Sequence, residues 1–294
     1  MSVSNDLPLV SIITPSFNQG RFITDTIESV LSQNYPKLEY LVMDGGSTDE
    51  TLDILRSYGN RLTWRSGPDG GQADAVNAGF RLAQGEILGW LNSDDTYLPG
   101  AVEAAVTHLT THQNTAMVYG DAYYIDERNR VIGIYPTEDF DQHRLAKACF
   151  ICQPAAFFRR SAIEAIGGLD TRLQYCMDYE LWIRLARRFL IDRIPYVLAS
   201  SRQYPQTKTW SQRDRLFEEL CAVTQRSFGY TSRHWRMWHA YARLKGFSWP
   251  LARTVLYPAR TVLPERLFFG IRRRLPLWIN RLIFWDMRAW KKRI

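Results

Sequence analysis

The chain has 294 residues, of which 46% are hydrophobic and 23% charged, and its formal net charge is +7. These proportions are ordinary for a folded soluble protein, so they exclude a disordered chain, a collagen and a small disulfide scaffold. The charge is uneven, because residues 210–294 hold 18 Lys and Arg against 5 Asp and Glu, and seven of the ten Trp, whereas residues 1–209 hold 19 basic against 25 acidic residues.

The first third of the chain alternates short apolar runs with helical patterns. We expect strands at residues 9–14, 38–43, 62–65 and 86–91, and helices at 20–33, from Ser47 onward and at 72–84. Ser47 and Glu50 have the spacing of a capping box, which should begin the second helix. Strand–helix alternation of this kind predicts a mostly parallel sheet with helices on both faces.

The middle of the chain is more mixed. Helices are expected at 99–112, 161–166 and 178–189, and strands at 116–125, at 157–158 and at 191–199. From about residue 210 the pattern changes to Arg- and Trp-rich helical segments interrupted by prolines. We therefore expect a domain at 1–209 and a basic helical region at 210–294.

Polar clusters follow the four strands of the first third. They are Thr14-Pro-Ser16, Asp44-Gly-Gly46, Asp69-Gly-Gly-Gln72 and Asn92-Ser-Asp-Asp95. Ligands of parallel sheets bind at the carboxyl ends of the strands, so these clusters predict one site. Adjacent carboxylates such as Asp94 and Asp95 repel each other unless a cation or hydrogen bonds compensate. Solvated turns are the alternative interpretation of these Asp residues.

Asp178 stands near the start of the helix expected at 178–189. One interpretation is a general base held on a rigid element. The other is a carboxylate that the helix dipole favours at this end. Glu180 is the local competitor for the role of base.

Five motifs stand in one order along the chain. They are Pro8-Leu-Val-Ser-Ile-Ile-Thr-Pro-Ser-Phe-Asn18, Met43-Asp-Gly-Gly-Ser-Thr-Asp49, Asp74-Ala-Val-Asn-Ala-Gly79, Gly85-Glu-Ile-Leu-Gly-Trp-Leu-Asn-Ser-Asp-Asp95 and Asp178-Tyr-Glu-Leu-Trp-Ile-Arg184. Together they resemble an inverting family 2 glycosyltransferase with the GT-A fold, over about residues 8–209. The resemblance implies an α/β fold with a Rossmann-like nucleotide-binding sheet and helices on both faces, followed by the basic, aromatic helical extension.

The same resemblance implies a metal-dependent enzyme that moves a sugar from a nucleotide diphosphate sugar to an acceptor hydroxyl with inversion. Thr14, Pro15 and Ser16 match the segment that lines the nucleotide pocket. Asp44 matches the residue that contacts the nucleotide base, and the loop from Asp69 to Gln72 matches a segment near the base and diphosphate.

The resemblance places a Mn²⁺ or Mg²⁺ ligand at Asp94, donor contacts at Asn92 and Asp95, and the catalytic base at Asp178. Two positions depart from the family pattern. Asn92 replaces the first carboxylate of the metal-binding D-x-D motif, and Tyr204 stands where many relatives place a His ligand. We expect Arg202 and Lys208 to meet the diphosphate instead, as charge-assisted donors. The acceptor side is expected at Gln153, Pro154 and the segment up to Arg160.

The end of the chain has the pattern of basic amphipathic helices. One expected helical face carries Trp278, Leu282, Trp285 and Ala289, and another carries Arg281 and Arg288. Such helices suit the interface of an anionic membrane. Packing on the catalytic domain or on a second subunit is the alternative. Nucleic acid ranks last as a partner, because no zinc finger, RNA-binding signature or helix-turn-helix pattern accompanies the basic stretch.

These features predict a peripheral protein at the cytoplasmic face of the inner membrane, with a saccharide acceptor that is lipid-linked in cell-surface polysaccharide synthesis. The N-terminus does not resemble a secretory signal, and no apolar run approaches the ~18 residues of a transmembrane helix. Cys149 and Cys152 have metal-site spacing, but no second pair completes a zinc site, so we expect reduced, buried thiols.

Two other interpretations compete with a working transferase. The first is a catalytically decayed module that binds nucleotide sugars or membranes, which Asn92 and Tyr204 favour. The second is a Rossmann dehydrogenase, which is disfavoured because no G-x-G-x-x-G follows the first strand.

Overall fold

The computed structural model describes residues 7–240 and 242. The elements of its first half are β1 (Val10–Ser16), α1 (Gly20–Leu31), β2 (Leu38–Asp44), α2 (Thr51–Ser57), the 3₁₀ turn η1 (Gly59–Arg61), β3 (Thr63–Ser66), α3 (Gln72–Leu82), β4 (Ile87–Trp90), β5 (Thr96–Tyr97) and α4 (Ala101–Thr111). The elements that follow are β6 (Thr115–Ile125), β7 (Val131–Ile134), α5 (Gln142–Leu145), the 3₁₀ turn η2 (Gln153–Ala155), β8 (Ala156–Arg159), α6 (Arg160–Ile166), α7 (Met177–Ala186), β9 (Leu190–Arg202), α8 (Lys208–Ser211) and α9 (Arg213–Phe228).

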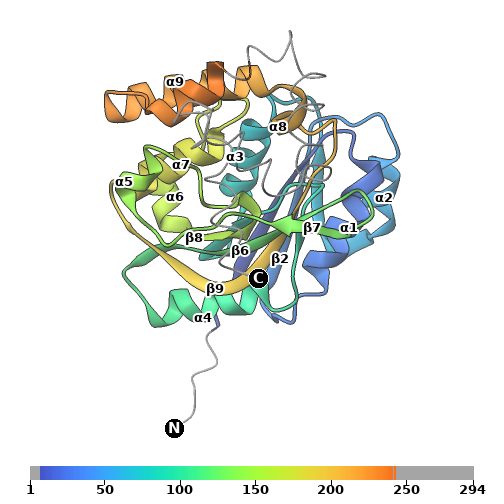
Figure 1. The fold of residues 1–294 in the computed structure, drawn as a ribbon. Helices are drawn as coiled ribbons and strands as arrows, with labels where there is room; N and C mark the ends of the chain where they lie inside the picture. The colour runs from blue at the N-terminus through green and yellow to red at the C-terminus, as the bar shows by residue number, and fades with distance from the viewer. Residues whose placement is uncertain (1–6, 241, 243–294) are drawn as a thin grey trace, which may run out of the picture. The chain divides into compact units, whose positions relative to one another are not determined.

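The described strands form one curled sheet in the order β3-β2-β1-β4-β8-β6-β9-β5, with β7 paired to β6 (Figure 1). Strands β3, β2, β1 and β4 are parallel, as the strand–helix alternation predicts. Beyond β4 the sheet is mixed and not mostly parallel as expected: β8 runs antiparallel to both β4 and β6, whereas β6 and β9 pair in parallel. A hairpin strand and a one-turn helix separate β6 from β8. This connection lacks the packed crossover helix that joins parallel neighbours.

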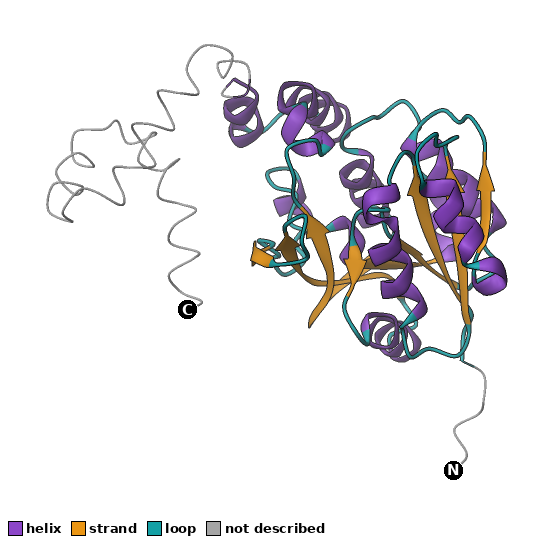
Figure 2. Ribbon diagram, turned by 90° about the vertical axis from the view of Figure 1, so that its right-hand side faces the viewer, coloured by secondary structure: helices purple, strands orange, loops and turns teal. Residues whose placement is uncertain are grey.

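Helices cover both faces of the sheet (Figure 2). Side chains of a strand point alternately to the two faces, so neighbouring residues of β1 enter different cores. Ile12 packs in the core that α1 and α4 cover, and Ile13 packs in the core that α3 and α7 cover. Both side chains are fully buried. The runs of apolar residues in the sequence therefore reflect burial on two sides.

Helix α2 begins at Thr51 with Glu50 as its N-cap residue, three residues later than the capping-box spacing predicts. The Ser47 hydroxyl does not cap a helix, because it donates to Asp44 and accepts a hydrogen bond from the backbone N–H of Asn18 at 2.7 Å. Asp49 instead accepts from the backbone N–H of Thr51, the first residue of α2, at 3.1 Å. Ser47 thus organises the loop after β2 rather than a helix end.

Described residues up to 239 make one compact unit, and α9 is part of it. Leu220 and Val223 of α9 are buried in the same core as α3 and α7. The amphipathic pattern expected around Trp278 and Trp285 lies outside the described residues. In the part of the chain that is described, no helix combines the length and the apolar character needed to cross a bilayer.

Candidate active site

The polar segments after β1, β2, β3 and β4 are tied together at the carboxyl edge of the sheet. The backbone N–H of Gly45 donates to the carbonyl of Ser16 at 2.8 Å, and that of Gly67 donates to the carbonyl of Asp44 at 3.1 Å. The Gln72 amide donates to Asn92 Oδ1 at 2.8 Å, which links the loop after β3 to the loop after β4. The structure therefore brings together the clusters that the sequence places at separate strand ends.

Asp44 organises the loop that follows β2. Its Oδ2 accepts from the backbone N–H groups of Gly46 and Ser47, at 3.0 and 2.9 Å, and from Ser66 Oγ at 2.6 Å. Its Oδ1 accepts from Ser47 Oγ. The side chain is buried, so these four donors compensate the loss of water around the carboxylate. Any contact with a ligand would use an oxygen that already holds this loop.

The end of β1 presents both satisfied and unsatisfied polar groups. Thr14 Oγ1 lies 3.1 Å from the hydroxyl of Tyr40. Ser16 Oγ is buried and has no hydrogen-bond partner among the described residues. Pro15 between them has no N–H to donate, yet it stands in register with Met43 of β2. A buried orphan hydroxyl at a strand end is the sort of group that a bound ligand satisfies.

The loop after β3 is held by a local turn. Asp69 is exposed, and its Oδ1 accepts from the backbone N–H of Gly71 at 2.8 Å. Gly71 has a φ of +105°, which side-chain-bearing residues rarely adopt. A methyl group placed on Gly45 would lie 3.0 Å from Asp69 Oδ2, so the Asp69 carboxylate faces the loop after β2. The two glycine-containing loops are therefore neighbours.

Asn92 forms four side-chain hydrogen bonds. Its Oδ1 accepts from Trp90 Nε1 at 2.9 Å and from Gln72 Nε2 at 2.8 Å. Its Nδ2 donates to Gln153 Oε1 at 2.9 Å and to Asp95 Oδ2 at 3.2 Å. An indole N–H only donates, which fixes the orientation of the Asn92 amide. An amide therefore fits this position better than a carboxylate, which would face the oxygens of Gln153 and Asp95 with no proton to donate.

Asp94 and Asp95 are held in different ways. Asp95 is buried, and its carboxylate accepts from the backbone N–H of Arg202 at 2.9 Å. Asp94 accepts from the hydroxyl of Tyr204 at 2.9 Å. Burial raises the pKa of both carboxyls, and the charge of Asp94 adds to the large rise in the pKa of Asp95. The hydrogen-bond donors around Asp94 and Asp95 therefore do not fully stabilise two negative charges.

The side chain of Arg202 does not reach toward a diphosphate, contrary to the sequence-based expectation. It is 2% exposed, and its guanidinium donates to the carbonyls of Asp94 and Asp126 at 2.7 and 3.0 Å. It also pairs with Asp25 at 3.2 Å and stacks over the ring of Phe22 at 4.6 Å. Because all these partners lie inside the protein, Arg202 fixes the end of β9 against the Asp94 turn.

Lys208 does reach the donor-side loops. Its Nζ lies 3.4 Å from Gln72 Oε1, and the carboxylates of Glu219 and Asp69 are near enough to stabilise its charge. Burial nevertheless lowers the pKa of Lys208, which is the dominant effect. An anionic ligand beside Lys208 would offset this effect of burial and stabilise the charged amine.

The residues present suit a divalent cation bound partly by substrate. Among the described residues no three His, Cys, Asp or Glu side chains cluster as a complete metal cage. Mg²⁺ and related ions, however, bind through one or two carboxylates together with substrate phosphates. Asp94 provides a carboxylate whose only side-chain donor within the described chain is the neutral hydroxyl of Tyr204. A cation there would relieve the charge that burial disfavours at Asp94 and Asp95.

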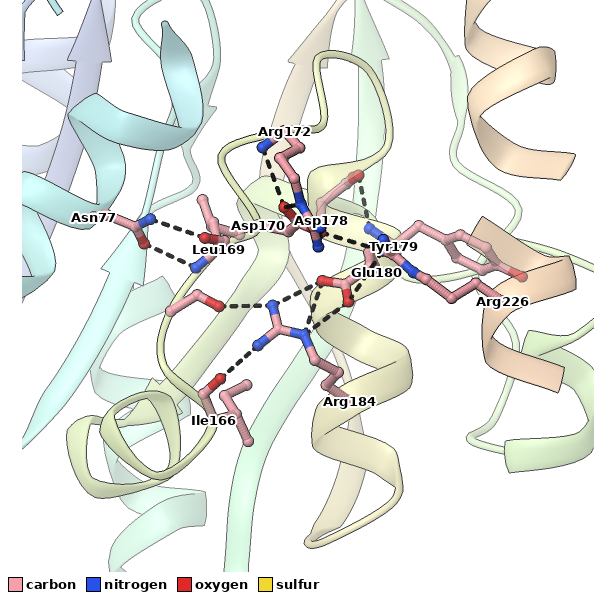
Figure 3. A network of polar contacts seen from close by, with 11 residues as sticks. Asn77, Ile166, Leu169, Asp170, Arg172, Asp178, Tyr179, Glu180, Arg184 and Arg226 are labelled. Atoms are coloured by element: carbon pink, nitrogen blue, oxygen red, sulfur yellow. Dashed lines mark hydrogen bonds and ion pairs between the residues drawn. The ribbon is translucent and has the colours of Figure 1, made fainter. Parts of the chain in front are cut away.

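Asp178 and Glu180 lie on the first turn of α7 and have opposite surroundings (Figure 3). Glu180 is buried and accepts two hydrogen bonds of 2.8 Å from Arg184 Nε, while Arg184 also donates to the carbonyls of Ile166 and Gly168. Asp178 accepts from the backbone N–H of Tyr179 at 2.8 Å and has no ion-pair partner within the described ranges. The geometry therefore leaves Asp178, and not Glu180, available to take up a proton.

Burial raises the pKa of the Asp178 carboxyl to about 6, and the charge of Glu219 on α9 adds to this rise. Hydrogen bonds from backbone N–H groups at the helix start act in the opposite direction. The charges of Asp95 and Asp178 both raise the pKa of the Cys152 thiol, after burial itself. Both carboxylates therefore lie within electrostatic range of one buried thiol.

Three residues at the site escaped the sequence analysis in whole or in part. Phe17 follows β1 and is 60% exposed, beside the Asp44 loop. Gln153 was expected on the acceptor side, but its amide is buried and joins Asn92 to the carbonyl of Trp90 at 2.6 Å. Glu219 lies beyond the expected domain boundary at residue 209. An exposed aromatic directly after a buried strand was a usable signal for Phe17, whereas nothing in the sequence pointed to Glu219.

Comparison with known proteins gives a consistent family. The model of Glycosyl transferase family 2 matches residues 11–167, more than half of the chain. An uncharacterized glycosyltransferase of Rickettsia prowazekii is 31% identical over 224 residues, which cover 72% of this chain and 69% of that protein. The hyaluronan synthase of Pasteurella multocida is 31% identical over 186 residues, which cover 62% of this chain but only 19% of the synthase.

A solved structure agrees with the sheet topology. The mannosyltransferase PcManGT of Pyrobaculum calidifontis, in complex with GDP-Man and Mn²⁺, has a TM-score of 0.62 to this chain at 18% identity. The alignment covers 97% of this chain and 86% of PcManGT. The fold is therefore of the GT-A type, and the chain belongs to glycosyltransferase family 2.

Replacing Asn92 by Asp should destabilise the protein, although it restores the family's D-x-D pattern. The new carboxylate would face Asp95 and Gln153 Oε1, where Asn92 now donates. We expect a loss of about 1–3 kcal/mol in the free energy of unfolding at pH 7. The loss should shrink at pH 5, because protonation of the carboxyl pair removes the repulsion.

Thermal and urea unfolding at both pH values measure this effect. Asn60→Asp is the matched control, because it makes the same chemical change on an exposed turn. A stability of Asn92→Asp equal to that of the control at pH 7 would contradict the role of the neutral amide.

Proposed function

We propose that this glycosyltransferase moves a sugar from a nucleotide diphosphate sugar to an acceptor hydroxyl with inversion, and that Asp178 is the catalytic base. The observation that carries the proposal is the state of Asp178. It is a carboxylate at the start of a rigid helix, with a pKa of about 6 and no ion-pair partner in the described chain. A base of this kind is ionised at neutral pH but still has appreciable affinity for a proton.

On the donor side, the loops at the carboxyl edge provide the contacts. Ser16 Oγ is buried without a partner among the described residues, and a nucleotide hydroxyl or phosphate that reached it would supply the missing hydrogen bond. Thr14 and Pro15 shape the floor beside it, and Asp44 fixes the loop against which the base would lie. The exposed ring of Phe17 offers a stacking surface for a planar base.

The diphosphate would lie between Asp94 and the loop from Asp69 to Gln72. Asp94 would hold a Mn²⁺ or Mg²⁺ ion, with Asn92 and Asp95 keeping the turn in place. When bound, such an ion neutralises the charge that develops on the leaving diphosphate. Lys208 adds a cation on the same side, because its Nζ reaches Gln72. The Mn²⁺ in the PcManGT complex supports this assignment by likeness of fold.

The transfer itself needs one displacement. Asp178 takes the proton of the acceptor hydroxyl as its oxygen attacks the anomeric carbon, and the bond to the diphosphate breaks on the opposite face. No covalent intermediate is needed, because the attack is direct. The protein contributes chiefly by holding acceptor, base and donor in line. Glu180 takes no part, since Arg184 engages both of its oxygens.

The acceptor is proposed to be a lipid-linked saccharide at the cytoplasmic face of the inner membrane. Two observations support it: the excess of basic residues at 210–294, and the likeness to a synthase of a polysaccharide. Anionic lipids attract each Lys or Arg near the surface by about 1 kcal/mol. A catalytically decayed module is the second candidate, favoured by Asn92 and Tyr204, which stand where the family places a carboxylate and a His ligand.

Nucleoside diphosphates should stabilise the protein only in the presence of the metal. Purified protein is heated with UDP, GDP, dTDP or CDP, each with Mn²⁺ or with EDTA. A ligand at about 100 times its Kd adds about 2.7 kcal/mol of stability. We expect one nucleotide to raise the Tm with Mn²⁺, and Asp94→Asn to remove this rise, whereas Asp53→Asn on the exposed face of α2 should keep it.

Equal stabilisation with EDTA would contradict a metal at Asp94. A protein that responds to none of the four nucleotides would favour the decayed module.

Asp178→Asn should abolish turnover while keeping donor binding. Loss of a general base costs about 10²–10⁴-fold in rate. The rate is followed as nucleoside diphosphate release from the sugar nucleotide that the thermal panel selects. In the unmodified enzyme this rate should fall below a pH of about 6, because the Asp178 carboxylate becomes protonated. A variant that keeps more than about 1% of the rate would rule Asp178 out as the base.

The same variant should be more stable than the native protein at pH 7. A carboxyl whose pKa is raised by folding disfavours the folded state above that pKa, so Asn relieves a cost of up to about 3 kcal/mol. The gain should vanish as the pH falls from 7 to 4, because the native carboxyl then carries its proton in the folded state. A gain that is independent of pH would contradict the raised pKa.

The full-length chain should float with vesicles of phosphatidylglycerol but not with vesicles of phosphatidylcholine. Arg281→Gln together with Arg288→Gln should weaken flotation by more than tenfold, since each Arg contributes about 1 kcal/mol. The matched control is Arg56→Gln with Arg61→Gln, which removes the same charge from exposed positions of the catalytic unit. Equal flotation of the two double variants would refute the proposed role of the tail.

A further inference from the structure

A carboxylate from α9 holds the segment that leads into α7. Glu219 Oε1 accepts from the backbone N–H groups of Tyr175 and Cys176, and Oε2 accepts from that of Gln174, each at 2.8 Å. Cys176 is the N-cap residue of α7, and its own side chain makes no capping bond. A charge from a distant part of the chain therefore holds the backbone N–H groups of the three residues that precede the first residue of α7.

Helix α9 is fixed at both ends relative to α7, so the position of Glu219 is determined. At the start of α9, the hydroxyl of Tyr175 donates to Gln212 Oε1 at 2.6 Å. Toward its end, Arg226 lies 3.2 Å from Asp170 and 3.8 Å from Glu180 (Figure 3). Between these points, two side chains of α9 are buried in the core shared with α7.

The segment held by Glu219 also faces the donor-side loop. A methyl group placed on Gly71 would lie 3.6 Å from Gln174 Oε1. Gly71 is the residue before α3 and is held by Asp69. Residues 174–176 thus lie between the loop expected at the diphosphate and the helix that carries Asp178. A displacement of this segment would change the distance between base and donor.

We propose that Glu219 is a positioning residue for sugar transfer, which sets the place of Asp178 relative to the donor by holding residues 174–176. The inference rests on the proposed role of Asp178 as the base. Glu219 acts through the backbone and needs no contact with substrate. It also makes α9, which lies outside the residues matched by the family model, a working part of the catalytic unit.

Glu219 acts on Asp178 electrostatically as well. Its negative charge contributes to the raised pKa of Asp178, after burial. The other titratable groups that interact with Asp178 in the described chain are thiols and a phenol, all with raised pKa values: Cys149, Cys152, Cys176 and Tyr135. These groups are neutral at neutral pH, so Glu219 is the charged neighbour whose removal can shift the acid side of the pH profile.

The test compares Glu219→Gln with Glu218→Gln, an exposed neighbour on the same helix. Gln offers one acceptor oxygen for three N–H groups, so at least one is left without a partner. The rate is nucleoside diphosphate release from UDP-N-acetylglucosamine, GDP-mannose and dTDP-glucose in Mn²⁺, measured against pH. Amide hydrogen exchange of residues 174–179 is the readout that needs no substrate.

We expect Glu219→Gln to lower kcat by about 10²-fold while the donor Kd changes by less than about threefold. Exchange at residues 174–179 should become at least about tenfold faster, since these N–H groups lose protection. The acid limb of the pH profile, where the rate falls as Asp178 becomes protonated, should move to lower pH, because a negative charge near Asp178 is removed. Glu219→Asp keeps the charge, so its acid limb should stay in place while its kcat is partly reduced.

A Glu219→Gln variant with the kcat and acid limb of Glu218→Gln would overturn the proposal. So would a loss of kcat accompanied by an equal loss of donor binding, which would indicate a general structural role. If Glu219→Gln does not fold, Glu219→Asp decides instead: an unchanged kcat together with unchanged amide exchange at residues 174–179 would overturn the proposal. Failure of the proposed function looks different, because Asp178→Asn would then retain turnover whatever the result at Glu219.

Discussion

Two adjacent carboxylates at the end of β4 are the constraint to which much of the surrounding structure responds. Burial disfavours the charge on Asp94 and Asp95, so the fold gathers donors around them. Arg202 supplies both a backbone N–H to Asp95 and a buried guanidinium against the carbonyl of Asp94. The long strand β9 is thereby locked to the donor edge. The compensation stays incomplete, which is what a site for a cation or a cationic ligand group requires.

The two acidic residues at the start of α7 differ in how their charges are compensated. At Glu180 the charge is fully matched by Arg184, and that pair clamps α7 to the segment after α6. Two residues earlier in the same turn, Asp178 receives hydrogen bonds from backbone N–H groups alone among the described residues. The same short helix thus carries one carboxylate that is paired with an arginine and one that has no ion-pair partner in the described chain. Glu180 thus holds the helix in place, while Asp178 stays available for the proton transfer that we propose, so neither side chain has to serve both purposes.

Local patterns in the sequence predict the parallel half of the sheet well, because apolar strands followed by amphipathic helices reflect burial on two faces. They also place the polar clusters at one edge, since the carboxyl ends of parallel strands coincide. The antiparallel placing of β8 could not be predicted in this way, as it depends on a pairing between strands distant in sequence. The direction of the Arg202 side chain depends likewise on its contact with Phe22 and Asp25. The role of Glu219 could not be predicted for the same reason, since its partners are backbone N–H groups more than forty residues away in the sequence.

Asn92 illustrates why a family motif and a local network must be considered together. Taken alone, an amide in place of an acid weakens a metal site by one charge. In its surroundings the amide matches two donors and two acceptors, among them Gln72 of the donor loop and Gln153 of the turn before β8. An acid there would add a third negative charge to a pair already short of compensation. In the proposed function, this departure leaves the diphosphate to Asp94, Lys208 and the substrate's own phosphates, and it leaves the geometry of the turn intact.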